Sequence, residues 1–239
     1  MSRTARVAEE IFSRFPTFRR GLVVAGNLTN APQNEALERL LAESVRRAGE
    51  APVDMQNDPR MTAWNETYKA LGIKPNKFPP AHRSLIKRVQ KADASLPFIN
   101  SVVAVMNIAS IEGVLPVGGD DAARTSGNMA LRFALGTETF APLGKPEETE
   151  NPEEGEVIYV DEGTDKVMCR RWNWRNGHQT RITESTESLV MNIDGLGEDS
   201  STRATRMRDR VAELLAEHCG ARVETALLTP DSPELTLPF

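Results

Sequence analysis

The chain has 239 residues, of which 39% are hydrophobic and 26% are charged, and its formal net charge is −5. This composition predicts a soluble globular protein of the cytoplasm and excludes one that binds nucleic acid over its whole surface. The aliphatic runs are too short to cross a bilayer, the start has no signal-peptide pattern, and two cysteines are too few for a disulfide framework.

The first third of the chain predicts four helices and one strand. Apolar side chains predict a short helix over 3–14, and GLVVAGNL at 21–28 predicts a buried strand followed by turn residues. Leucines at helical spacing predict a helix over 33–48. A capping side chain and a proline at 57–59, and the prolines at 79–80, mark the starts of two further helices.

Three residues on these later helices have competing interpretations. Trp64 and Tyr68 lie about one turn apart, which favours a shared place in the core; the alternative is a platform on which an RNA base stacks. His82 stands alone near a helix start, which favours a surface or cap position over metal binding. The segment 67–92 contains basic residues and no acid, so it is expected to form a cationic surface.

The stretch 96–121, LPFINSVVAVMNIASIEGVLPVGGDD, centres on a buried helix. Asn100 and Asn107 are separated by about two helical turns, so their amides share one side. Buried amides must be satisfied, so this side either anchors a loop or lines a pocket. The glycines at 118–119 predict a turn with close backbone approach, and the aspartates at 120–121 predict turn and cap residues rather than a metal site.

The second half of the chain predicts mainly strands. They are expected at 127–135, 156–160, 166–172, 188–193 and 223–228, with one amphipathic helix at 202–219. No repeat and no clear linker divides the sequence. We therefore expect one α+β domain over residues 1–239, with a mixed or antiparallel sheet and a central buried helix.

The segment 169–180, CRRWNWRNGHQT, gathers arginines beside tryptophans. If this segment is a strand, Arg171 and Trp172 lie on opposite faces. An arginine beside an indole can stack a base or hold a phosphate. The alternative is a strand whose tryptophans fill the core while its arginines reach acids from 147–165, which contains nine acids and no base.

Several chemistries are disfavoured because their motifs are missing. The sequence has no phosphate-binding glycine loop, no dinucleotide-binding glycine fingerprint and no nucleophile elbow. The three histidines lie far apart and neither cysteine has a partner at metal spacing, so neither zinc nor another cofactor is predicted. Cys169 is expected to be a small buried residue rather than a nucleophile.

The segments 96–121 and 169–180, together with residues around them, resemble a known family. A proline, an asparagine opening a helix, a second asparagine seven residues on, and a proline with a turn ending in aspartate resemble the editing domain of the bacterial phenylalanyl-tRNA synthetase beta subunit and its free-standing relatives. The synthetase has a histidine where this chain has Gly118. The similarity covers roughly residues 60–225 and rests on Trp64, Tyr68, Gly72, Pro75, Leu96, Pro97, Asn100, Asn107, Pro116, Gly118, Asp121, Gly127, Leu131, Arg132 and the run CRRWNWR.

This resemblance implies an α+β fold with a pocket for an aminoacyl ester, where the synthetase hydrolyses tyrosine wrongly attached to the phenylalanine tRNA. Carried over to this chain, it implies that Asn100 and Asn107 position the pocket or a water molecule. Backbone N–H groups around Gly118 would hold the oxyanion. Asp121 would face the substrate amine, and His178 would relay a proton. The terminal ribose hydroxyl of the substrate would assist.

The partner implied by the resemblance is tRNA with its aminoacylated 3′ end. The expected RNA contacts are Lys77, Arg88, Arg171, Trp172, Asn173 and Arg175, and such binding should weaken steeply with salt. Two functions remain open. One is trans-editing hydrolysis of a mischarged aminoacyl-tRNA. The other, which Gly118 favours, is a module that binds tRNA or an amino acid without hydrolysis. The sequence predicts neither the amino acid nor the oligomeric state.

Overall fold

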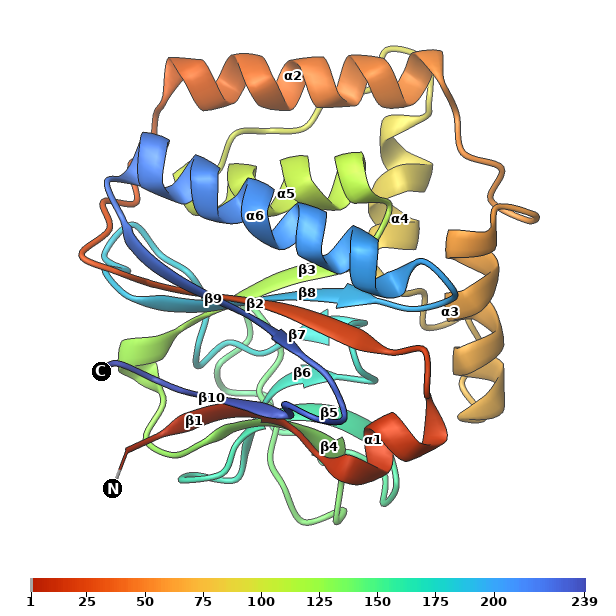
Figure 1. The fold of residues 1–239 in the computed structure, drawn as a ribbon, viewed down its shortest axis with the longest axis vertical. Helices are drawn as coiled ribbons and strands as arrows, with labels where there is room; N and C mark the ends of the chain where they lie inside the picture. Colours follow the sequence, from red (N-terminus) through yellow and green to blue (C-terminus); the bar gives the residue numbers. More distant parts are fainter. Residues whose placement is uncertain (1) are drawn as a thin grey trace.

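The computed structural model describes residues 2–239 and arranges them in three layers (Figure 1). A layer of helices covers one face of a four-stranded sheet, and a six-stranded sheet packs against the other face. One apolar core lies between the helices and the four-stranded sheet, and a second lies between the two sheets. The chain therefore has the predicted α+β fold in one domain.

The four-stranded sheet has the order β3-β8-β2-β9 and is antiparallel throughout. Its strands are β2 (Arg19–Gly26), β3 (Val117–Asp121), β8 (Leu189–Gly195) and β9 (Arg222–Leu228). The apolar run in β2 directs alternate side chains into the two cores, which is why this strand sits inside the sheet. β3 lies at an edge, so one side of its backbone has no neighbouring strand.

The six-stranded sheet is mixed and has the order β10-β1-β4-β5-β6-β7. Its strands are β1 (Thr4–Val7), β4 (Met129–Phe133), β5 (Val157–Asp161), β6 (Lys166–Arg170), β7 (Arg175–Asn176) and β10 (Glu234–Thr236). β1 and β4 run parallel, and the other neighbouring pairs run antiparallel. Because β1 pairs with both β10 and β4, this sheet joins the two terminal segments to the middle of the chain.

The helices are α1 (Glu9–Arg14), α2 (Glu35–Glu50), α3 (Pro59–Ala70), α4 (Ala81–Val89), α5 (Ser101–Gly113) and α6 (Ser200–Cys219). α5 is apolar on most of its surface and packs among α2, α4, α6 and β3. It is therefore the predicted central buried helix. β3 follows it directly, so this helix positions the edge strand.

Aromatic side chains fill much of the core between the sheets. The Trp64 ring from α3 lies 5.3 Å from the Trp172 ring, and the Phe18 ring lies 5.0 Å from the same indole. Arg20 and Asp194 form a buried ion pair beside them, with Nε 2.7 Å from Oδ1. Trp172 Nε1 donates to Asp194 Oδ2 at 3.1 Å. The core prediction for Trp64 is confirmed, and Trp172 belongs to the same cluster.

Three local predictions are wrong. Residues 3–14 divide into strand β1 and helix α1, because β1 pairs with β4 and β10. The glycines at 118–119 lie within strand β3 instead of a turn, because β8 runs alongside them. The strand expected at 166–172 ends two residues early, where Arg171 and Trp172 adopt left-handed φ angles of 47° and 68°. Each difference depends on a contact with a segment distant in the sequence.

Candidate functional site

Helix α5 begins at a side-chain cap. Asn100 is 3% exposed, and its Oδ1 accepts a hydrogen bond from the backbone N–H of Val103 at 2.9 Å. Asn30 Oδ1 accepts from the Val102 N–H at 2.9 Å, and its amide donates to the Thr183 carbonyl at 2.8 Å. The Asn100 oxygen therefore holds the start of helix α5. This contact fits the loop-anchor alternative, and the catalytic role expected for Asn100 stays a prediction.

Asn107 lies two turns further along α5 and is half-buried. Its amide makes no hydrogen bond within residues 2–239. Strand β3 passes close to this part of the helix, since a Cβ added at Gly119 would lie 3.2 Å from Met106 Sδ. Asn107 therefore has an uncommitted side-chain amide, and it lies on the helix side of the sheet, toward which β3 turns Gly119 and not Gly118.

The face of β3 has an open place at Gly118. A Cβ built there would meet no heavy atom within 4 Å. Gly118 pairs with Asn192 of β8, so the open place lies beside the Asn192 side chain on the same sheet face. Asn192 Oδ1 and the Tyr159 hydroxyl are both buried; the two side chains lie close to each other but outside hydrogen-bond geometry, and neither atom has another partner among the described residues. Such atoms are rare in proteins, and Asn192 borders an unfilled space, so both are candidate ligand contacts.

The sequence analysis missed Asn192 and Tyr159. Both lie in strands that are otherwise apolar, VIYVD and LVMNIDG, and neither belongs to a recognisable motif. The one available signal is a polar residue at every second position of β8, Asn192 and Asp194, which marks a strand face that is not purely apolar.

Asp121 has a structural role. It accepts hydrogen bonds from the Thr186 hydroxyl at 2.8 Å and from the Ala123 N–H at 3.0 Å, and it caps the short turn that follows β3. Each of its oxygens already accepts one hydrogen bond inside the fold, and its expected role as the partner of a substrate amine stays a prediction. The expectation that it acts as a turn and cap residue is confirmed.

Asp120 is the aspartate that shares the strand face of Gly118. Its Oδ1 accepts from the Thr180 hydroxyl at 2.5 Å. Burial raises the pKa of Asp120 to about 7; the nearby Asp121 charge adds to this shift, while Thr180 and Arg20 oppose it. A carboxyl group with such a pKa can accept or release a proton near neutral pH.

His178 follows strand β7 and lies near the end of β3. Its Nδ1 accepts from the Gly144 N–H at 3.2 Å, and its backbone N–H donates to the Ala141 carbonyl at 2.8 Å. The half-buried ring lines a surface hollow of about 480 Å³. Two residues later Thr180 bonds Asp120, so one short segment links His178 to the end of β3. No hydrogen bond within residues 2–239 joins His178 to Asn107.

The arginines of the CRRWNWR run are paired with carboxylates. Arg170 Nη2 lies 2.7 Å from Glu156 Oε2, and its Nη1 lies 2.7 Å from Glu150 Oε2. Arg175 Nη1 lies 3.0 Å from the other oxygen of Glu150. Arg171 Nε lies 3.8 Å from Glu156 Oε2. The alternative in which these arginines reach the acidic segment is confirmed, and Arg171 and Arg175 are not free phosphate contacts.

The other two residues of this run that were expected to contact RNA also make contacts within the fold. Trp172 is 1% exposed, so its ring offers no surface on which a base could stack. Asn173 Oδ1 accepts from the Tyr68 hydroxyl at 2.8 Å, and its backbone carbonyl accepts from the Ala81 N–H at 3.0 Å. Asn173 thus fastens α3 and α4 to the turn between β6 and β7. Tyr68 is fully buried, as predicted.

Lys77 and Arg88 remain as the accessible cations of the predicted RNA-binding set. Both side chains are exposed, and neither lies within 4 Å of a carboxylate in the described part of the chain. Lys87 and Lys91 are exposed on or just after the same helix, α4. The cationic surface predicted from the sequence therefore forms along α4 and the turn before it.

His82 is a buried residue, contrary to the surface or cap position that was predicted. It is 0% exposed, and its ring lies 5.9 Å from the Trp64 ring. Burial lowers the pKa of His82 to about 3, and the nearby Arg203 and Arg83 charges add to this shift. The ring is therefore neutral at physiological pH and has no role in acid–base chemistry there.

Neither a metal-binding cluster nor a membrane-spanning helix occurs among residues 2–239. Between residues 2 and 239, no group of three or more His, Cys, Asp or Glu side chains is arranged to hold a metal ion. None of the helices described there combines the length and the apolar character needed to span a bilayer. Cys169 is buried as predicted, and burial raises the pKa of its thiol well above the usual range, so the nucleophilic thiolate is disfavoured.

Comparison with known proteins identifies the family. A crystal structure of an N-terminal fragment of the phenylalanyl-tRNA synthetase beta subunit from Pyrococcus horikoshii is similar, at 13% identity and a TM-score of 0.46. The similarity covers 91% of this chain and 49% of that one, so the chain spans about half of the fragment. No curated protein matches the sequence. The B3/4 domain, which occurs in the phenylalanyl-tRNA synthetase beta subunit, matches residues 63–220, and the chain belongs to the B3/4 domain family.

Proposed function

We propose that this protein binds the aminoacylated 3′ end of tRNA and hydrolyses the ester of a mischarged aminoacyl-tRNA. Membership of the B3/4 family supports the substrate class. The observation that carries the proposal is the open place at Gly118. It borders the side chain of Asn192, and the buried oxygens of Asn192 and Tyr159 lie near each other without reaching hydrogen-bond geometry with any described group. A polar ligand in this place would satisfy atoms that the fold leaves unsatisfied.

An aminoacyl ester is labile, so the site needs only modest chemistry. It must position a water molecule, stabilise the developing oxyanion and hold the substrate amine. In this proposal Asn107 positions the substrate or water, backbone N–H groups beside Gly118 serve the oxyanion, and Asn192 accepts from the amine. Asp120, rather than Asp121, accepts a proton from the attacking water molecule, because the raised pKa of Asp120 lies near neutral pH.

The RNA would reach this site across the cationic surface along α4. Arg88 and Lys77 have no carboxylate within 4 Å in residues 2–239, although Lys77 shares a hollow with glutamates of the segment 153–156. Contacts of this kind release counterions, so the affinity should fall steeply as salt rises. A protein acting on tRNA in this way would work in the cytoplasm.

The functional unit in this proposal is the whole chain, 1–239. The family match at 63–220 leaves out β1, β2, β9 and β10. Without them the four-stranded sheet loses half of its strands, including the inner strand β2, and the six-stranded sheet loses two. The matched segment alone is therefore expected to be unstable.

The test is ester release from a panel of correctly and wrongly charged tRNAs. Gly118→Val would place a side chain in the open space and should block release, and Asn107→Ala should slow it. Gly26→Val is the matched control, because a Cβ at Gly26 in the same sheet also meets nothing within 4 Å. If no tRNA loses its amino acid faster than in buffer, hydrolysis is excluded. If the Gly118 and Gly26 variants are equally active, the open place at Gly118 is not the substrate site.

A second function is favoured by one specific observation. Of the expected catalytic residues, Asn100 and Asp121 serve the fold, and Gly118 replaces the family's histidine. These features fit a module that binds charged tRNA or an amino acid without hydrolysis. Filter binding separates the two functions: the module retains charged tRNA with its ester intact, and Gly118→Val still abolishes retention.

A further inference from the structure

The surface hollow beside His178 is lined by cations and carries no carboxylate. Its volume is about 480 Å³, and it lies between the segments 139–149, 166–167 and 178–181. We call it the cationic hollow; its lining residues are Arg124, Thr139, Phe140, Ala141, Pro146, Thr149, Lys166, Val167, His178, Gln179 and Arg181. Three of them are cations and none is an acid, although the chain as a whole has a net charge of −5.

The other surface hollows differ from it in charge. A hollow of about 290 Å³ contains Lys74, Lys77 and Arg171, but its wall also contains Glu153, Glu154 and Glu156. Three further hollows each include two or three carboxylates. Positive charge in those places faces carboxylates of the same wall, whereas the wall of the cationic hollow contains none, and of its three cations only Arg124 has a carboxylate nearby, that of Asp121.

Two of the three cations of the hollow have no carboxylate partner in residues 2–239. Lys166 and Arg181 lie within 4 Å of no carboxylate among residues 2–239, and Arg181 Nη1 donates to the His178 backbone carbonyl at 3.1 Å. Arg124 Nε lies 3.4 Å from Asp121 Oδ2, an oxygen that already accepts from a threonine hydroxyl. The guanidinium of Arg181 is therefore oriented by a neutral group and keeps its full charge for a ligand.

His178 adds a hydrogen-bond donor to the hollow. Its Nδ1 accepts from the Gly144 N–H at 3.2 Å, so the proton of the neutral ring is on Nε2. Thr139, Thr149 and Gln179 provide further polar groups that make no side-chain hydrogen bond in the described residues. Donors and positive charge thus converge on one hollow, which is the chemistry that binds a phosphate group.

We propose that the cationic hollow binds a phosphate group of the terminal nucleotides of a single-stranded RNA end. This inference rests on the proposed function and assigns its phosphate subsite. The hollow lies next to the candidate site, since Thr180 bonds Asp120 and both neighbours of the Thr180 segment, His178 and Arg181, line the hollow. Its volume falls in the range of small-ligand sites and accommodates about one nucleotide.

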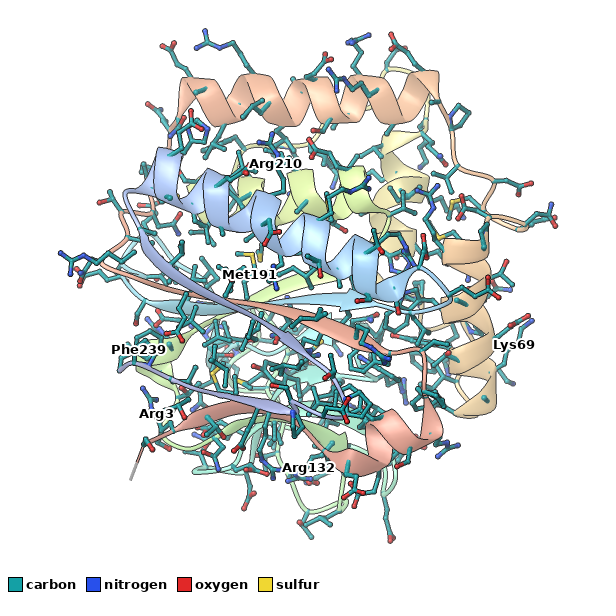
Figure 2. All side chains as sticks on the ribbon, viewed as in Figure 1. Arg3, Lys69, Arg132, Met191, Arg210 and Phe239 are labelled. Atoms are coloured by element: carbon teal, nitrogen blue, oxygen red, sulfur yellow. The ribbon has the colours of Figure 1, made fainter. Side chains whose placement is uncertain are left out.

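The experiment measures binding of a 5′-phosphorylated CCA trinucleotide, of AMP and of inorganic phosphate, each at two salt concentrations. Lys166→Gln and Arg181→Gln should each weaken trinucleotide binding about tenfold and lower the salt slope by about one. The double variant should weaken it further. Lys69→Gln removes one exposed charge from α3, which points away from the molecule (Figure 2), and should change nothing.

Each outcome decides the proposal. Loss of trinucleotide binding in the double variant, with a melting curve like that of the wild type, supports it even if no charged tRNA is hydrolysed. Unchanged trinucleotide binding in the double variant overturns it, whatever the hydrolysis assay shows. Binding of AMP or inorganic phosphate as tight as that of the trinucleotide overturns the RNA assignment and indicates a site for free phosphate compounds.

Discussion

The CRRWNWR run and the cationic hollow both contain arginines. Arg181 of the hollow follows the last arginine of the run, Arg175, by six residues. In the run, Arg170, Arg171 and Arg175 meet carboxylates of the acidic segment. In the hollow, Arg181 is held by a backbone carbonyl and meets no carboxylate in residues 2–239. The arginines of the run stabilise the fold through ion pairs, whereas the charge of Arg181 in the hollow remains available to bind an anion.

This difference teaches that arginine content alone does not locate an anion-binding site. The run looks more like an RNA-binding segment because tryptophans accompany its arginines. Folding places Trp172 in the core and brings Glu150 and Glu156 against the arginines. Whether a cation is available depends on the carboxylates that folding brings near it, and these come from another part of the chain.

The largest expected effect is that of Trp172→Ala. Trp172 packs against three aromatic rings at 5.0 to 5.3 Å, so its loss should lower the free energy of unfolding by about 3–5 kcal/mol. Urea unfolding measures this change. Trp174→Ala is the control, because Trp174 is half-buried and packs mainly on Phe78, and it should cost less than half as much. Equal effects would show that Trp172 is not the core residue of the run.

Glu156→Gln should have the next largest effect. The Glu156 carboxylate accepts from Arg170 at 2.7 and 3.0 Å, and also from the Arg171 N–H at 3.0 Å. Its neutralisation should cost about 2–3 kcal/mol, since Glu150 continues to hold Arg170. Thermal melting checks this against Glu154→Gln, an exposed carboxylate without a partner in residues 2–239. Identical melting temperatures would mean that the pairing does not support the fold.

Asp120→Asn should have a smaller effect that depends on pH. The folded pKa of about 7 lies above the unfolded value of 3.8, so folding favours the protonated acid. The wild type therefore loses stability as pH rises from about 4 to 7, and the loss is complete above pH 7. The neutral Asn variant avoids it, and its advantage should be about 2–3 kcal/mol larger at pH 8 than at pH 5. A stability difference that is the same at both pH values contradicts the assignment.

The smallest expected effect on stability is that of Arg181→Gln. Because Arg181 has no carboxylate partner in residues 2–239, the free energy of unfolding should change by less than about 0.5 kcal/mol. Arg170→Gln is the matched comparison and should destabilise the protein clearly, because it leaves buried Glu156 without its main partner. If both substitutions destabilise the protein equally, Arg181 supports the fold as Arg170 does, and the proposed difference between the hollow and the CRRWNWR run is wrong.

Much of the helical structure could be predicted from local sequence. The Asn100 cap and the apolar run after it mark α5, and the aspartate–proline pair marks α3. These signals act within a few residues of the helix start, where the capping oxygen meets the next N–H groups. The strand β2 was predicted because a continuous apolar run is buried on both faces of a sheet.

The failures share one physical cause. The side chains of the arginine–tryptophan run do not alternate as in a strand, because Arg171 and Trp172 have left-handed φ angles. This backbone conformation directs the Trp172 indole into the core. The glycines at 118–119 became a strand because β8, about 70 residues further along the chain, pairs with them. His82 is buried because α3 presents Trp64 to it. A local pattern holds no information on these distant neighbours.

The sequence by itself determined the α+β class, the central helix, the family resemblance and the acid-free basic segment along α4. Only the tertiary structure decided which polar residues are free. It engaged Asn100 and Asp121 in the backbone, left Asn107 open, and placed unpartnered Asn192 beside Gly118. The physical reason is that helix and strand formation depend on near neighbours, whereas the availability of a polar atom depends on every group that folding brings within hydrogen-bond distance of it.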